Sequence, residues 1–172
     1  MSVTTARINI VKILLNVIDA NQDPKQDKMS MKCKFVRQDN AVKDPIISAF
    51  LEDHPGGFIA LNRGDIIYLQ ENSEIIGALN FEEADDDHPS PPYIWVDAFW
   101  IFDKNNRRKG YGTKLMKCFF ERIIKIKKNV RLLPVQHEDA KKFFDKLHFK
   151  EIKDQQVEIT FKDIIKYHLS EK

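Results

Sequence analysis

The sequence predicts an α/β fold in which a central mixed β-sheet is flanked by helices. Segments of strand composition alternate with segments whose apolar residues recur every three or four positions. Residues 93–102 are almost continuously apolar and rich in β-branched and aromatic side chains, as expected of a central strand covered on both faces. Residues 65–71 and 74–82 are two further strands, and Asn72-Ser73 between them fits a tight hairpin turn.

The main part of the chain is predicted to run strand, helix, three strands, helix, strand, helix and two strands. The longest helix keeps a period near 3.6 in its apolar residues Leu115, Met116, Phe119, Phe120, Ile123 and Ile124. The expected segments, in order, are strand 32–37, helix 41–51, strands 65–71, 74–82 and 93–102, the helix from 112, strand 130–135, a helix around 140–147, and strands 149–152 and 157–161.

The first 30 residues form a separate part of the predicted organisation. Apolar residues recur there at helical spacing: Ile8, Val11, Leu14, Leu15 and Ile18. They predict an amphipathic helix over residues 4–19, followed by a polar linker over 20–30. We therefore divide the chain into residues 1–30 and a main domain, 31–172. The helix either packs on the surface of the main domain or contacts a partner, which could be a second copy in a homodimer.

Composition fits a globular chain without a membrane partner. The 172 residues are 42% hydrophobic, which is enough for a core, and no apolar run approaches the ~18 residues that a membrane span needs. We find no signal peptide pattern and expect a cytoplasmic protein, with a nuclear location left open. Cys33 and Cys118 are too few to staple a chain of this length, so both are expected to be buried or inert thiols in a reducing compartment.

Charge is distributed unequally between the two halves of the chain. Residues 1–92 carry 9 Lys and Arg against 15 Asp and Glu, net −6, whereas residues 93–172 carry 19 against 11, net +8. A basic half could bind nucleic acid, but its charges are spread over a glycine turn and helix faces rather than interleaved with aromatic residues. A phosphorylated cofactor on the basic half and a cation on the acidic half would explain both signs.

The turn between the central strand and the longest helix has the composition of an anion site. Gly110 and Gly112 lack the Cβ that would keep a ligand from the main chain, and the helix that follows directs its positive end at the same place. Arg107, Arg108 and Lys109 add side-chain charge, so a phosphate or pyrophosphate site is predicted. The alternative is an ordinary strand-to-helix turn. The turn lacks the third glycine of a dinucleotide fingerprint and the G-K-[ST] of a Walker A loop.

Residues 107–112, Arg-Arg-Lys-Gly-Tyr-Gly, resemble motif A of the GNAT superfamily of acetyl-CoA-dependent N-acetyltransferases, [QR]-x-x-G-x-[GA]. Residues 137–149 are similar to a second family segment, Asn-x-x-Ala-x-x-aromatic-aromatic-x-x-x-Gly-Phe, and keep its spacing. The resemblance covers about residues 32–161. His137 replaces an Asn that often contacts the pantetheine arm, Phe144 replaces a general-acid Tyr found in many members, and His148 replaces the Gly.

The resemblance implies a GNAT-like fold, here with an extra N-terminal amphipathic helix, and an acyltransferase activity. Acetyl-CoA would donate its acetyl group to a primary amine by direct attack in a ternary complex, with a main-chain N–H within residues 100–102 as the oxyanion donor. The residues that the resemblance assigns to the cofactor are Trp100, Ile101, Phe102, Arg107, Arg108, Lys109, Gly110, Tyr111, Gly112, Thr113, His137, Phe143 and Phe144.

An alkylammonium has a pKa near 10.4, so a base must help to deprotonate the acceptor. Family bases often lie on the fourth strand, where Asp97 is the only carboxylate in this chain. Counting back from Arg107 puts Val96 and Ala98 at the commonest base positions, so strand phase decides between a catalytic and a structural Asp97. Glu82, Glu83, a water relay or no dedicated base are the alternatives. The histidines are scattered and suggest no metal site.

Five carboxylates precede the central strand: Glu82, Glu83, Asp85, Asp86 and Asp87. By the family's topology they would lie on the acceptor side and favour a cationic amine, such as a polyamine, an aminoglycoside, or the lysine or N-terminal amine of a protein. The alternative is a solvated loop. Two other functions stay open, namely a catalytically silent acetyl-CoA-binding sensor or structural subunit, and a nucleic-acid-binding module.

Overall fold

A computed structural model of the chain describes residues 31–41, 43–53, 64–84, 91–102, 105, 108–133 and 138–170. They belong to one compact unit, Met31–Lys172. The predicted N-terminal helix and linker lie outside the described residues. The elements are β1 (Lys32–Val36), α2 (Gln38–Ala41), α3 (Pro45–Asp53), β2 (Asp65–Glu71), β3 (Glu74–Ala84), β4 (Tyr93–Ile101), α5 (Tyr111–Ile126), β5 (Val130–Leu132), α6 (Glu138–Lys146), β6 (Lys150–Glu151), β7 (Val157–Ile159) and α7 (Phe161–Ser170).

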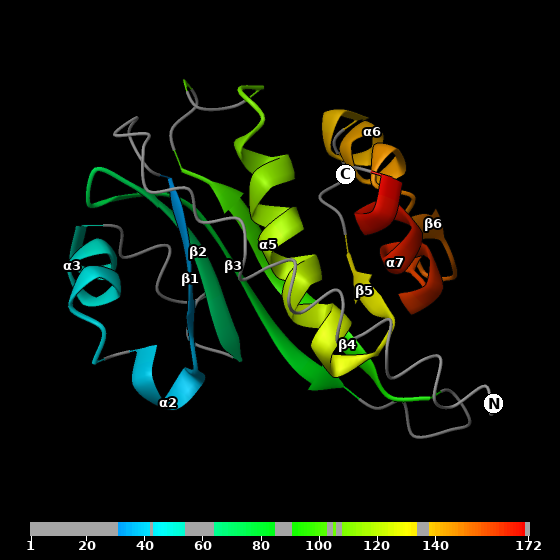
Figure 1. Ribbon diagram of the computed structural model, residues 1–172, viewed down its shortest axis with the longest axis horizontal. Coiled ribbons are helices and arrows are strands. Elements are labelled where there is room, and N and C mark those ends of the chain that lie inside the picture. Colours follow the sequence, from blue (N-terminus) through cyan, green and yellow to red (C-terminus); the bar gives the residue numbers. More distant parts are fainter. Residues whose placement is uncertain are drawn as a thin grey trace, which may run out of the picture. The chain divides into compact units, whose positions relative to one another are not determined.

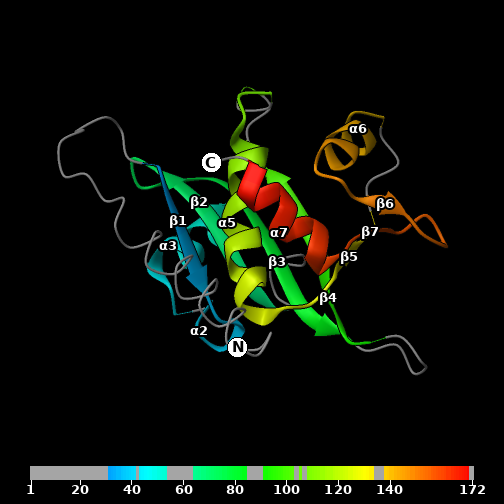
Figure 2. The ribbon, with the colours of Figure 1, turned by 45° about the vertical axis from the view of Figure 1, so that its right-hand side comes forward.

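Seven strands form one mixed sheet, which confirms the predicted fold class. Their order is β1-β2-β3-β4-β5-β7-β6, and only the β4–β5 pair is parallel among the described strands. The α5 and α7 helices lie on one side of the sheet and α3 lies on the other (Figures 1 and 2). The β2–β3 hairpin turns at Asn72 and Ser73, with φ of 49° and 70°, as a two-residue hairpin loop requires. β4 is therefore a central strand, as its apolar composition predicted.

The main core forms where α5 packs on the middle of the sheet. The predicted 3.6-residue period is confirmed, because the buried residues of α5 all lie on one face: Leu115, Met116, Phe119, Phe120 and Ile123. They pack against β3 and β4 residues such as Leu79, Phe81 and Val96. At ~1.5–3 kcal/mol for each fully buried large side chain, this face contributes on the order of 10 kcal/mol before entropy is counted. None of the described helices is long and apolar enough to cross a membrane.

The helix predicted over 41–51 is two helices, α2 and α3, because Pro45 favours the first turn of a new helix. Asp44 caps α3, and its Oδ1 accepts the N–H groups of Ile46 and Ile47 at 3.0 and 3.1 Å. Its Oδ2 accepts the hydroxyl of buried Tyr68 at 3.4 Å. Burial, with the nearby Asp44 charge, raises the pKa of Tyr68 to about 12, so the phenol stays neutral and can donate. Asp44 thus fixes α3 to the sheet.

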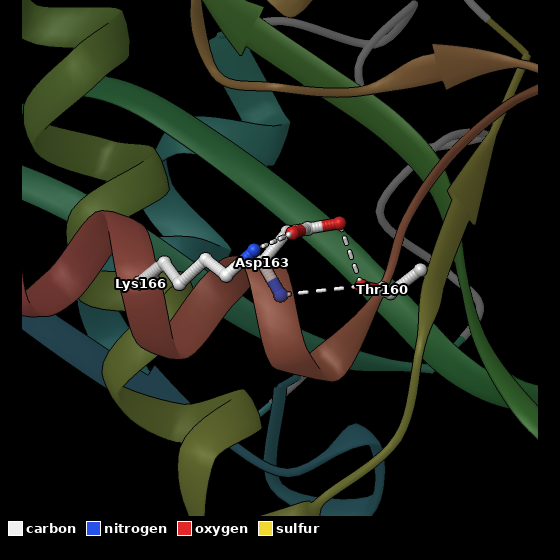
Figure 3. Close-up of polar contacts among 3 residues, drawn as sticks. All are labelled: Thr160, Asp163 and Lys166. Atoms are coloured by element: carbon white, nitrogen blue, oxygen red, sulfur yellow. Dashed lines mark hydrogen bonds and ion pairs between the residues drawn. The ribbon is translucent and has the colours of Figure 1, made fainter.

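The C-terminal helix α7 was missed by the sequence analysis, which ended the chain in a hairpin. Thr160 Oγ1 accepts the N–H of Asp163 at 3.2 Å and donates to Asp163 Oδ2 at 2.8 Å, while Lys166 Nζ lies 3.3 Å from Oδ1 (Figure 3). The Thr160 hydrogen bond, followed by Lys166, lowers the pKa of Asp163. Thr-x-x-Asp before an apolar periodic run is a helix-start pattern, so the sequence did contain the signal.

The structure corrects the expectation for the cysteines, because Cys33 on β1 and Cys118 on α5 form a disulfide. The two Cα atoms lie 6.4 Å apart, although the residues are 85 positions apart in sequence. One helical turn further on, the Arg122 guanidinium lies over the ring of Phe35 on β1, 4.1 Å from its centroid. The two contacts hold the edge strand β1 to α5. Sequence spacing alone could not bring these cysteines together.

Reducing this disulfide should lower the free energy of unfolding by about 2 kcal/mol, because the bond restricts an unfolded loop of 85 residues. This value is the lower end of the usual stabilisation by a disulfide, about 2–4 kcal/mol, because β1 is mostly exposed. The measurement is urea unfolding with and without dithiothreitol. A Cys33→Ala/Cys118→Ala double variant is the control and should not respond to reductant. Equal midpoints of the wild type in both conditions would show that the bond does not stabilise the fold.

Candidate functional site

The N-terminus of α5 presents main-chain N–H groups beside Gly110. Gly110 is the N-cap residue, with φ of 84° and ψ of −2°, and among the described residues no side chain forms a cap hydrogen bond there. The first intrahelical bond runs from Lys114 N–H to Gly110 O at 3.0 Å, so the N–H groups of Tyr111, Gly112 and Thr113 have no acceptor within the helix. A Cβ added at Gly110 would meet no atom of the described residues within 4 Å. The turn therefore combines open space, three directed donors and the positive end of a helix dipole.

The two glycines of this turn have different roles. A Cβ at Gly112 would lie 3.4 Å from ring atoms of both Phe143 and Phe99. Gly112 thus makes room for aromatic packing, whereas Gly110 supplies a left-handed backbone and leaves the approach open. The sequence pattern predicts the same role for both glycines, because it shows that the Cβ is missing but not which atoms lie around it.

Of the three basic residues of the turn, the structure describes Arg108 and Lys109. The Arg108 guanidinium donates to Asp139 Oδ2 at 2.9 Å, and both side chains are exposed. This ion pair links the turn to the first turn of α6. Lys109 is exposed beside Gly110, whereas Arg107 and His137 lie outside the described residues.

The aromatic pair on α6 divides between surface and core. Phe143 is half-buried and stacks on Phe99, with ring centroids 5.4 Å apart. Phe144 is 5% exposed and packs edge-on against Phe99, Phe143 and Phe149, with centroids 5.1–6.0 Å away. Phe143 is therefore the residue of the pair that reaches the surface beside Gly112, and Phe144 belongs to the main core.

Phe144→Tyr should destabilise the fold by about 1–2 kcal/mol, because the added hydroxyl would enter an apolar cluster. Phe143→Tyr is the matched control and should cost much less, since Phe143 is half-buried. Thermal unfolding of both variants provides the comparison. If Phe144→Tyr has the same Tm as the wild type, the added hydroxyl has a polar partner or solvent, and position 144 is accessible from the turn at Gly110.

A β-bulge in β4 sets the position of Asp97. Asn80 pairs with Ala98 and Phe81 pairs with Val96, so Asp97 is the extra residue between the two pairs. The Trp95 indole N–H donates to Asp97 Oδ1 at 2.8 Å. Ile94 and Val96 pack in the core under α5, so Trp95 between them faces the opposite side of the sheet. The hydrogen bond to Trp95 places the exposed Asp97 side chain on that side as well. The bulge therefore fixes which side of the sheet each β4 side chain faces.

The main chain after the bulge has one unpaired side within the described part of the sheet. β5 pairs with β4 only from Ile94 to Val96. Phe102 N–H donates to Ile76 O on the β3 side at 3.0 Å, and antiparallel pairs alternate, so Ile101 N–H points away from β3. Of the three residues expected to supply an oxyanion donor, Ile101 is the one whose N–H is directed toward this edge.

The acidic residues before β4 do not form one surface. Glu82 is exposed and lies opposite Trp95. Glu83 lies opposite Ile94 and forms an ion pair with Lys128 after α5, so it belongs to the other side of the sheet. Asp85, Asp86 and Asp87 lie outside the described residues. In the described part of the chain, no three His, Cys, Asp or Glu residues are grouped as metal ligands would be.

Comparison with known proteins identifies the family. The family model of the Acetyltransferase (GNAT) domain matches residues 62–151, and no curated protein sequence matches the chain. Similar solved structures include AtaTR bound with AcCoA (TM-score 0.58, 13% identity, covering 78% of this chain and 96% of that one). Another is the KacTA–DNA complex, with a TM-score of 0.59 and 15% identity, which covers 81% of this chain and 99% of its own. A third is an aminoglycoside acetyltransferase from an uncultured soil metagenomic sample. Its TM-score is 0.52 at 17% identity, and the match covers 72% of this chain and 94% of that one.

These structures share the fold of the chain, and the family match spans more than half of its length. The turn at Gly110, the bulged central strand and the parallel β4–β5 pair all fall within the matched residues. The chain belongs to the GNAT acetyltransferase family.

Proposed function

We propose that the protein is an N-acetyltransferase that transfers an acetyl group from acetyl-CoA to a primary amine in a ternary complex. The observation that carries the proposal is the set of directed N–H groups at the start of α5, open at Gly110 and next to the unpaired edge of β4. A solved structure of the same fold, AtaTR, is bound with AcCoA. Family membership and this geometry support acetyl-CoA as the donor.

The pyrophosphate would accept hydrogen bonds from Tyr111, Gly112 and Thr113, with Lys109 adding charge. The pantetheine arm would follow the edge of β4, past the half-buried rings of Phe99 and Phe143. The thioester oxygen would then accept a hydrogen bond from Ile101 N–H. This donor is held in place by the β3 pairing, so it costs little reorganisation as the oxygen gains charge.

The reaction requires a neutral amine at the thioester carbon. The amine lone pair forms the new C–N bond and the C–S bond breaks. The nitrogen then releases its second proton to water, and the departing CoA thiolate takes up a proton from water to become the free thiol. Asp97 takes the ammonium proton, directly or through bridging water, and its hydrogen bond with Trp95 fixes the orientation of the carboxylate. No covalent intermediate with the protein is needed.

A cationic acceptor fits the charge around Asp97. Exposed Glu82 lies on the same side of the sheet, and residues 85–87 add three carboxylates to the segment that leads into β4. A carboxylate-rich surface raises the local concentration of a cation. One solved structure of this fold is an aminoglycoside acetyltransferase. We place polyamines, aminoglycosides, and lysine or N-terminal amines of proteins in the acceptor class.

The test has two steps. Calorimetric titration of the full chain with acetyl-CoA should give saturable binding, and a panel of amines should then release CoA thiol and yield acetylated product by mass spectrometry. Binding without turnover on any amine would favour an acetyl-CoA sensor or structural subunit over an enzyme. Absence of binding would overturn the proposal.

A further inference from the structure

The chain contains two tryptophans, and both lie on the same side of β4. Trp95 donates to Asp97, on the side away from α5. After the bulge, Phe99 and Ile101 pack toward α5, so Trp100 and Phe102 point to the opposite side. The rings of Trp100 and Phe102 meet edge-on with centroids 6.3 Å apart, and Phe102 joins the cluster under α3. Asp97 therefore lies between two indoles on one face of the strand.

This face of β4 is incompletely covered by the described residues. Ile46 and Ile47 of α3 pack over the neighbouring strands, against Tyr68 and Ala78. Trp100 keeps 37% of its surface exposed, Asp97 is exposed and Trp95 is half-buried. We call the residues Glu82, Trp95, Asp97, Ala98 and Trp100 the tryptophan–carboxylate patch. Within it, Ala98 is the small, half-buried residue beside Asp97.

The chemistry of the patch selects a cation with apolar character. Indole faces attract ammonium and guanidinium groups, and the carboxylates of Asp97 and Glu82 add opposite charge. The adjoining surface already holds such a contact, since the Arg131 guanidinium lies 4.1 Å from the Tyr93 ring centroid. Arg131 is itself paired with Glu158 at 2.7 Å, so it does not neutralise the patch. An anionic acceptor would meet two carboxylates, and a neutral one would gain only apolar contact.

We infer that the tryptophan–carboxylate patch is the acceptor site, and that it binds a polycationic amine with a cationic group against Trp100 while the reacting amine lies near Asp97. The inference rests on the proposed function and adds to it the residues that bind the acceptor and the requirement for a second cationic group on it. Trp100 is a specificity residue here, because it would contact the acceptor without taking part in proton transfer. A monoamine, which has no second cation, would use only part of the site.

Intrinsic fluorescence tests binding without turnover, because both tryptophans of the chain lie in the patch. We would titrate the full chain with spermidine, kanamycin and a lysine-rich peptide, and use 1,8-octanediol as the neutral control. At least one cationic probe should change the emission saturably, and the diol should not. Trp100→Leu should weaken that probe about 5- to 10-fold, and Trp100→Phe should weaken it less. Leu169→Ala, which alters an exposed apolar side chain on α7, should bind as the wild type does.

Kinetics separate this inference from the proposed function. The resemblance assigns Trp100 to the cofactor, but its side chain lies on the side of β4 away from α5. In Trp100→Leu, KM for the cationic acceptor should therefore rise by a similar factor, and it should change more than either kcat or the Kd of acetyl-CoA. Turnover with an unchanged acceptor KM in Trp100→Leu would overturn the acceptor site and leave the acetyltransferase proposal intact. Failure to bind acetyl-CoA would overturn the acetyltransferase proposal, while the fluorescence titration would still test the patch. No emission change with any of the three cations would overturn the patch.

Discussion

Gly110→Asp should weaken acetyl-CoA binding by about 30- to 1,000-fold, which corresponds to a loss of about 2–4 kcal/mol. A side chain at Gly110 would enter open space at the start of α5, beside the three N–H groups that have no acceptor within the helix. A carboxylate there would occupy the proposed pyrophosphate position and repel its charge. Calorimetry with acetyl-CoA gives the measurement.

Two properties of this variant make the result interpretable. Asp is a favourable residue at a helix N-cap, so its side chain should help the N-terminus of α5 even though φ of 84° is unfavourable for a residue with a Cβ. Gly110→Asn is the matched control, since it has nearly the same size and backbone preference but no charge. Asn should weaken binding clearly less than Asp. If a folded Gly110→Asp protein binds acetyl-CoA with wild-type affinity, the pyrophosphate does not bind at this turn.

Sequence periodicity was sufficient for the elements that make up the core. The apolar stripe of α5, the continuous apolar run of β4 and the Asn72-Ser73 turn each have one strongly favoured conformation, and the structure contains all three. These features depend on neighbours close in sequence, where the spacing of side chains fixes which face they share. The order of the strands in the sheet, by contrast, comes from the structure.

Features that depend on contacts between distant segments could not be predicted in the same way. The bulge at Asp97 adds one residue to a strand whose composition is continuous, so no pattern shows where the side chains change face. The Cys33–Cys118 bond depends on the packing of β1 against α5. The burial of Phe144 beside half-buried Phe143 depends on how both rings pack against Phe99 of β4, which is distant in sequence.

Asp97→Asn should lower kcat by about 100- to 10,000-fold, the usual contribution of a general base, with the Kd of acetyl-CoA unchanged. Asn keeps an Oδ1 acceptor for the Trp95 indole, and the position is exposed, so the fold should be retained. The variant loses the carboxylate that would take the proton, and it also removes one negative charge from the tryptophan–carboxylate patch, so kcat is compared at saturating acceptor. Single-turnover measurements with saturating acetyl-CoA would separate this loss from product release.

Trp95→Phe is the matched control for Asp97→Asn, because it removes the indole N–H and leaves the carboxylate in place. A positioning role for Trp95 predicts a kcat loss well below that of Asp97→Asn. Asp97→Glu should recover part of the activity, since it restores a carboxylate that is displaced by one methylene. If Asp97→Asn stays within about threefold of wild-type kcat, proton removal does not depend on this side chain. The Trp95–Asp97 hydrogen bond would then serve the bulge rather than the reaction, and the base would have to be sought among Glu82, residues 85–87 or solvent.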